Sequence, residues 1–340
     1  MPDLVDIGIL LGGLLLLMIG GDVMVRGAVR IAERLNLSPM LIGLVIVGLG
    51  TSSPELAASV QAALAGSPGL AIGNIVGSNI ANLLLVLGAA ALIAPLAVDR
   101  TSLWRDGGVG LAAALAMIIA SFTLGLDRIV ATVLLIGLAL YIWSAYKQEK
   151  MATPGADQSA RPAIDHSAAF GRAAASEGFD PELSAQNNTH GSLAKALLFF
   201  VVGLVLIVGG GTLLVNGAVS IASAFGVSEA VIGLTIVAFG TSAPELVTSV
   251  IAAMRGQSDI ALGNVLGSNI YNMLFIGGVT GLAAPSDFPA QIVTFDLPLA
   301  ALAAFVVMVF AYTGGRLSRR EGGILLAAYV AYTGFTSGLF

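Results

Sequence analysis

The chain has 340 residues, of which 57% are hydrophobic and 10% are charged, and its formal net charge is −5. Soluble domains carry about 25% charged residues, so this composition excludes an ordinary soluble protein and favours a chain surrounded by the lipid bilayer. The absence of cysteine excludes disulfides and thiolate metal sites. No nucleic-acid partner is expected.

Apolar stretches follow one another along the chain, each close to the roughly 20 residues that a membrane-spanning helix needs. Their hydrophobicity is continuous rather than alternating, which predicts helices and not the strands of a barrel. We therefore expect an all-α polytopic membrane protein with ten transmembrane helices. The predicted spans lie near residues 4–25, 39–64, 70–96, 107–125, 128–146, 194–222, 229–254, 260–284, 292–313 and 320–339.

The basic residues predict how the ten spans are oriented. When successive loops are assigned alternately to two sides, all of the 15 Lys and Arg residues except Arg128 fall on one side. The positive-inside rule makes that side cytoplasmic. We expect both termini outside an integral plasma (bacterial inner) membrane protein. The predicted organisation is a first membrane domain at 1–146, a flexible cytoplasmic linker at 147–192 and a second membrane domain at 193–340.

The two membrane domains are related in sequence. A shift of 190 residues aligns 42–88 with 232–278 without a gap, and 26 of the 47 aligned residues are identical. Each domain holds five predicted spans, an odd number, so the second domain begins on the opposite side of the membrane from the first. The sequence thus predicts two inverted five-helix repeats, an arrangement in which secondary transporters bind their substrate near the midplane.

Each repeat carries one glutamate deep inside an apolar stretch. Glu55 ends the motif GTSSPE, and Glu245 ends its counterpart GTSAPE. An ionisable group at that depth costs roughly 2.5–3.5 kcal/mol even on lenient insertion scales. Neither glutamate has a basic partner in its own span. We interpret them as ligands of a cation; the alternative is a protonated, hydrogen-bonded structural acid.

Oxygen atoms of other side chains are expected around each glutamate. Thr51 and Ser52 precede Glu55 by four and three residues, which places them on the same helix face. The next motif, GNIVGSNIAN at 73–82, places Ser78 and Asn82 on one face of the following helix, and GNVLGSNIYN at 263–272 repeats it. Hard cations such as Ca²⁺ prefer oxygen ligands of these kinds.

The proline of each GTSxPE motif is expected to expose a backbone oxygen. Pro54 has no N–H, so the carbonyl of Gly50 is predicted to lose its helical donor, and Pro244 has the same effect on Gly240. The motif therefore adds a carbonyl to the expected cation site.

Four other polar residues are assigned structural roles. We attribute Ser59 and Ser249 to helix packing, because small polar residues commonly lie between membrane helices. Asp106 and Asp296 begin their predicted spans, and we expect both to cap helix N-termini.

The doubled GTSxPE and GNxxGSNxxN motifs resemble the alpha-repeats of the sodium/calcium exchanger family, and the resemblance covers nearly the whole chain. It implies a secondary active antiporter, not an enzyme, that exchanges Na⁺ for Ca²⁺ by alternating access and uses no cofactor. Exchange of three Na⁺ for one Ca²⁺ would be electrogenic. Some prokaryotic members and the potassium-dependent branch carry Asp where this chain has Asn272. The resemblance implies these ligands: Glu55, Glu245, Thr51, Thr241, Ser52, Ser242, Ser78, Ser268, Asn82, Asn272 and the backbone oxygens of Gly48 and Ala238.

Two other functions are alternatives to this one. A proton-coupled calcium antiporter is the nearer alternative, because a buried glutamate can carry a proton. An intramembrane lipid-phosphate hydrolase using Glu and Ser is the alternative from another class. Such chemistry needs a positive charge near the phosphate, and the sequence places no Arg, Lys or His at mid-membrane depth in the predicted spans.

Overall fold

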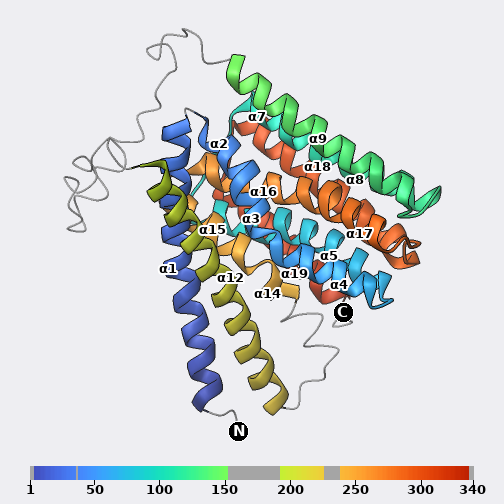
Figure 1. Ribbon diagram of the computed structural model, residues 1–340, viewed down its shortest axis with the longest axis horizontal. Coiled ribbons are helices and arrows are strands. Elements are labelled where there is room, and N and C mark those ends of the chain that lie inside the picture. The colour runs from blue at the N-terminus through green and yellow to red at the C-terminus, as the bar shows by residue number, and fades with distance from the viewer. Residues whose placement is uncertain (1–3, 36, 152–191, 226–237, 337–340) are drawn as a thin grey trace.

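The computed structural model describes residues 4–35, 37–151, 192–225 and 238–336, and every long element in these ranges is a helix (Figure 1). Labels beginning with η mark π-helical turns. The first half contains α1 (Leu4–Leu35), α2 (Pro39–Ile42), η1 (Gly43–Val47), α3 (Gly48–Thr51), α4 (Ser53–Leu64), α5 (Pro68–Ala81), η2 (Asn82–Val86), α6 (Leu87–Ile93), α7 (Arg100–Ser102), η3 (Leu103–Gly107), α8 (Gly108–Phe122) and α9 (Arg128–Met151).

The second half repeats much of this order. It contains α12 (Leu193–Ala224), α14 (Ala238–Thr241), α15 (Ala243–Met254), α16 (Ser258–Ile270), η5 (Tyr271–Ile276), α17 (Gly277–Ala283), η6 (Ile292–Asp296), α18 (Leu297–Gly314) and α19 (Arg319–Thr336). Two short strands, β1 (Leu96–Ala97) and β2 (Arg316–Leu317), pair antiparallel. An isolated bridge joins Leu126 to Ser286, so the two halves touch through two short strand-like contacts.

Within the described ranges, seven helices are long and apolar enough to cross a membrane, and a bent pair makes eight. The two remaining predicted spans are only partly supported. Much of 229–254 lies outside the described residues, and its visible part is the short α14 and α15. The span at 320–339 corresponds to α19, whose first three residues, Arg319, Arg320 and Glu321, are charged. The predicted flexible linker at 147–192 lies mostly outside the described residues.

The bent pair consists of Gly43–Thr51 and Ser53–Leu64, whose axes differ by 48°. The break falls at Ser52, and Pro54 occupies the first turn after it, as expected for a residue that cannot donate to the preceding turn. The N–H of Ser52 donates to the Gly48 carbonyl at 3.0 Å. Pro54 has no N–H to offer the Gly50 carbonyl, so the exposed carbonyl at Gly50 stays a prediction.

The two longest helices, α1 and α12, lie side by side and antiparallel at one side of the other helices (Figure 1). Their backbones approach closely at glycines spaced seven residues apart. A Cβ atom on Gly20 would lie 2.8 Å from the Ile207 nitrogen, and one on Gly210 would lie 2.8 Å from the Leu17 nitrogen. This approach is possible only without side chains, as is common for helices packed in membranes.

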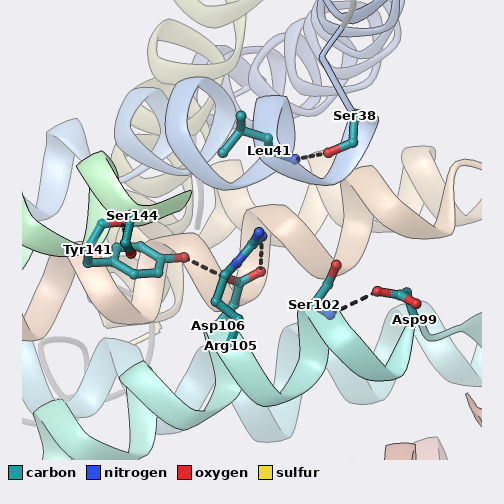
Figure 2. A network of polar contacts seen from close by, with 8 residues as sticks. All are labelled: Ser38, Leu41, Asp99, Ser102, Arg105, Asp106, Tyr141 and Ser144. Atoms are coloured by element: carbon teal, nitrogen blue, oxygen red, sulfur yellow. Dashed lines mark hydrogen bonds and ion pairs between the residues drawn. The ribbon is translucent and has the colours of Figure 1, made fainter. Parts of the chain in front are cut away.

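Asp106 is fully buried within a helix that begins earlier than predicted, at Arg100 rather than near residue 107 (Figure 2). It accepts hydrogen bonds from Arg105 Nε at 2.6 Å and from Tyr141 OH at 2.9 Å. The helix can include Arg105 because Asp106 compensates its charge. The N-cap is instead Asp99, which accepts from the Ser102 N–H at 2.8 Å.

Asp296 makes the corresponding contact in the second half, where Tyr332 OH donates to its Oδ1 at 3.0 Å. Its backbone is helical and its side chain makes no capping hydrogen bond. The prediction that Asp106 and Asp296 are N-caps is therefore wrong. Each instead ties its own span to the tyrosine of a neighbouring helix, because a buried carboxylate is stable only when hydrogen-bond donors surround it.

These pairs give a prediction about stability. Tyr332→Phe should lower the free energy of unfolding by about 1–2 kcal/mol, because it removes a hydrogen bond to a buried carboxylate. Tyr141→Phe should cost less, since Arg105 still donates two hydrogen bonds to Asp106. Thermal unfolding of the purified protein in detergent would compare them. A larger loss for Tyr141→Phe would contradict this ranking.

Candidate cation site

Glu55 and Glu245 occupy equivalent positions just after the helix breaks of the two halves. Each is the third residue of its helix, α4 or α15, and follows a proline. Both side chains are fully buried. The local sequence explains the placement, since the proline ends one helical segment and starts the next with the glutamate in its first turn.

The two carboxylates have few partners. Among the described residues, neither carboxylate oxygen of Glu55 has a hydrogen-bond partner. Glu245 Oε1 accepts from Ser52 Oγ at 3.3 Å, whereas Glu245 Oε2 has none in the described part of the chain. Leaving a buried carboxylate without donors is costly, so these oxygens have the character of ligands rather than of structural acids.

A cluster of oxygens from both halves adjoins the carboxylates. Thr51 Oγ1 lies 3.3 Å from the Gly48 carbonyl oxygen and 3.4 Å from Ser268 Oγ. Ser268 Oγ in turn lies 3.4 Å from the same carbonyl. Gly48 and Thr51 belong to the first half and Ser268 to the second, so the motif residues of the two halves meet at one place.

The amides of Asn82 and Asn272 are also fully buried, and neither amide atom of either residue has a hydrogen-bond partner among the described residues. Asn82 begins η2, which packs against α15, and Asn272 lies in η5, which packs against α4. Each asparagine is therefore on an element that contacts the helix bearing the glutamate of the other half. This pairing of each asparagine with the opposite half results from tertiary packing, because in sequence each asparagine lies closer to the glutamate of its own half.

The remaining predicted ligands are placed less fully. Ser78 and Ser242 are buried, and Ser242 Oγ lacks a partner in the described ranges. Thr241 is half-buried at the end of α14. Ala238 is the first residue of α14, and its surroundings lie outside what the structure describes. The contacts that are described join Gly48, Thr51, Ser52, Glu245 and Ser268.

Glycines allow the backbones of the site to come together. A Cβ atom on Gly48 would lie 3.0 Å from the Ser268 nitrogen, and one on Gly267 would lie 2.8 Å from Leu44 Cα. Both distances are shorter than normal packing permits. η1 and α3 therefore lie directly against α16. This close packing places the Gly48 carbonyl next to the hydroxyl of Ser268.

Two further asparagines of the same motifs, Asn74 and Asn264, belong to the site although the sequence reasoning did not predict them as ligands. Asn264 Nδ2 donates to the Glu245 carbonyl oxygen at 3.3 Å and to Ser249 Oγ at 2.8 Å. Asn74 repeats this with the Glu55 carbonyl at 3.2 Å and Ser59 Oγ at 2.9 Å. The signal was present in the sequence, since both asparagines follow their glutamate by 19 residues.

The donor set indicates the kind of ligand. The described residues contain no group of three or more His, Cys, Asp and Glu side chains placed to hold a metal. A cation at this place would be held by two carboxylates together with hydroxyl, amide and backbone oxygens. Such a set suits hard cations that prefer oxygen and need several ligands.

Comparison with known proteins gives the family. The family model described as "Sodium/calcium exchanger protein" matches residues 5–147 and 195–338. Over 338 residues the chain is 33% identical to "Sodium/calcium exchanger MaX1" of Methanosarcina acetivorans, covering 95% of this chain and 96% of the relative. It is 37% identical over 323 residues to "Putative antiporter CaxA" of Alkalimonas amylolytica, covering 94% of this chain and 95% of that one.

A solved structure agrees with this. The sodium-calcium exchanger NCX_Mj soaked with Na⁺ and Ca²⁺ superposes with a TM-score of 0.78 at 32% identity, covering 97% of this chain and 98% of the other. The protein belongs to the sodium/calcium exchanger family. It is an integral membrane protein and a cation/calcium antiporter of that family rather than an enzyme, so the hydrolase alternative is wrong.

Proposed function

We propose that the protein is a secondary active antiporter that exchanges Na⁺ for Ca²⁺ by alternating access. The observation that carries this proposal is the pair of fully buried carboxylates, Glu55 and Glu245, with unpartnered oxygens among the described residues. Family membership adds support, and so does the oxygen-rich set around Thr51 and Ser268.

The proposed ligands are the residues predicted from the motifs. Both carboxylates would bind cations, and the hydroxyls and amides would complete the coordination. Gly48 and Ser268 lie close to Thr51, and Ser52 donates to Glu245. These contacts support the proposal that all three residues are ligands. The buried, unpartnered amides support Asn82 and Asn272. The full proposed set is Glu55, Glu245, Thr51, Thr241, Ser52, Ser242, Ser78, Ser268, Asn82, Asn272 and the backbone oxygens of Gly48 and Ala238.

The proposed architecture is ten transmembrane helices in two inverted five-helix repeats, at 1–146 and 193–340, joined by a cytoplasmic linker at 147–192. Several observations support it. The equivalent helices α1 and α12 run antiparallel. The contact of Asn74 with the Glu55 carbonyl is repeated by Asn264 and Glu245. The family model also matches the chain as two segments.

We propose the membrane orientation that the distribution of basic residues predicts, with both termini outside the plasma membrane. All Lys and Arg residues except Arg128 then face the cytoplasm.

Two ionised carboxylates balance one Ca²⁺, whereas three Na⁺ in the same site would leave one extra positive charge. Exchange in that ratio is therefore proposed to be electrogenic.

The decisive experiment is Ca²⁺ uptake into vesicles that contain the purified protein. An outward Na⁺ gradient, with the pH gradient collapsed by an ionophore, should drive uptake that disappears when Na⁺ is equal on both sides. Protein-free vesicles are the control. Uptake that ignores Na⁺ and follows an imposed pH gradient would instead support the proton-coupled alternative. At three Na⁺ leaving for each Ca²⁺ that enters, one net positive charge leaves the lumen in every cycle. An inside-negative potential should therefore slow this Ca²⁺ uptake, and an inside-positive potential should accelerate it.

A further inference from the structure

The side chain of Asn264 makes three hydrogen bonds that use both ends of its amide. It is fully buried on α16. Nδ2 donates to Ser249 Oγ and to the Glu245 carbonyl oxygen, at 2.8 Å and 3.3 Å. Oδ1 accepts from Thr51 Oγ1, a residue of the other half, at 3.0 Å. Asn264 thus links the backbone of Glu245 to a motif hydroxyl of the opposite repeat through a single side chain.

These contacts fix which way the amide points. The Glu245 carbonyl oxygen can only accept a hydrogen bond, so the amide nitrogen of Asn264 must face it. The amide oxygen must then face Thr51, and that oxygen can also only accept. Thr51 is thereby made the donor, and its single hydroxyl proton is directed at Asn264 rather than at the cation site.

The direction of this proton matters for cation binding. A hydroxyl can ligate a cation only through a lone pair, so its proton must point elsewhere. Thr51 Oγ1 also lies near the Gly48 carbonyl and Ser268 Oγ, at 3.3 Å and 3.4 Å, which are longer contacts. Without Asn264, the Thr51 proton would be free to turn towards these groups or towards the site, where it would repel a cation.

We propose that Asn264 is a positioning residue that holds the Thr51 hydroxyl as a cation acceptor, so that one repeat sets the ligand geometry of the other. The inference rests on the proposed function and deepens it. Asn74, at the equivalent place in the first repeat, makes the same two donor contacts, with the Glu55 carbonyl and Ser59 Oγ. The repetition indicates a built feature of the site rather than a chance contact.

The test is a double-mutant cycle on purified full-length protein, with Ca²⁺ alone and Na⁺ alone titrated by calorimetry. Asn264→Leu should raise the dissociation constants about tenfold, as expected for losing one favourable ligand contact. Thr51→Val should have a similar effect. The double variant should be within about twofold of Thr51→Val alone, because the asparagine acts through that hydroxyl. In a Thr51→Ser background, which keeps the hydroxyl, the full effect of Asn264→Leu should return.

Ser249→Ala is the matched control, because it removes another partner of the same amide without touching Thr51. It should lower the melting temperature but leave the dissociation constants unchanged. The proposal is overturned if Asn264→Leu does not change them, if the two effects multiply, or if Ser249→Ala weakens binding equally. Should Asn264→Leu fail to fold, Asn264→Ala takes its place in the cycle. Absence of ion binding by the unmodified protein would count against the proposed function itself.

Discussion

Glu55→Gln is expected to abolish Na⁺-dependent Ca²⁺ uptake, with a loss of about a hundredfold or more. The substitution removes one of the two negative charges proposed to balance Ca²⁺ in a buried, weakly screened site. The glutamine side chain has nearly the same shape as the glutamate side chain that it replaces. Because neither carboxylate oxygen of Glu55 has a partner among the described residues, no described hydrogen bond is broken.

Stability measurements separate this from a structural role. Without ions, Glu55→Gln should melt at the same temperature as the unmodified protein or higher, since a buried charge has been removed. The stabilisation that saturating Ca²⁺ gives the unmodified protein should be lost. Ser53→Ala is the control, because Ser53 is exposed, lies two residues away and donates to the Leu49 carbonyl at 3.1 Å. Preserved transport in Glu55→Gln, or a lower melting temperature without ions, would mean that Glu55 is a structural acid.

Gly210→Ala is expected to destabilise the antiparallel pair of α1 and α12. The added Cβ atom would lie 2.8 Å from both the Gly13 carbonyl oxygen and the Leu17 nitrogen. Backbone atoms cannot turn aside as a flexible side chain can, so the two helices must separate along their contact. Overpacking of this kind typically costs about 1–3 kcal/mol, and the rigid backbone contact favours the upper end.

The neighbouring glycine offers a matched control on the same helix. Gly209 is exposed, and a Cβ atom there would meet nothing within 4 Å among the described atoms. Gly209→Ala should therefore be neutral or slightly stabilising, by up to about 1 kcal/mol from helix propensity. Thermal unfolding in detergent would compare the two variants. Equal melting temperatures for Gly209→Ala and Gly210→Ala would show that the α1–α12 contact is looser than the structure indicates.

Several features of the fold were predictable because they follow from local composition. A membrane span has to be apolar along its length, so most of the helices could be placed without any knowledge of their packing. The bend in the second span is different, because the sequence predicts one continuous span over 39–64 and uses Pro54 only to expose the Gly50 carbonyl, whereas the structure bends this span at Ser52. The start of the fourth span was placed too late, because Arg105 looked like a loop residue. Its charge is compensated by Asp106, which also accepts a hydrogen bond from Tyr141 on another helix, and that partner cannot be inferred from local sequence.

The candidate site divides in the same way. The repeat identified both glutamates and both asparagine-containing motifs, since duplicated polar residues in apolar stretches stand out in the sequence. It did not reveal that Ser52 of the first half bonds Glu245 of the second, or that Asn264 holds Thr51. Those contacts join residues about two hundred positions apart. They depend on which helices pack together, and nothing in either motif specifies its partner.

The membrane class, the duplication and the chemical identity of the candidate ligands follow from the sequence, because apolar length and polar motifs are local properties. That the two halves share one cluster of oxygens depends instead on how the helices pack. Glycines at 48 and 267 let the backbones of η1, α3 and α16 touch, and this close approach brings Gly48, Thr51 and Ser268 together. A cation site needs oxygens that converge from several directions, and no single membrane helix can supply them.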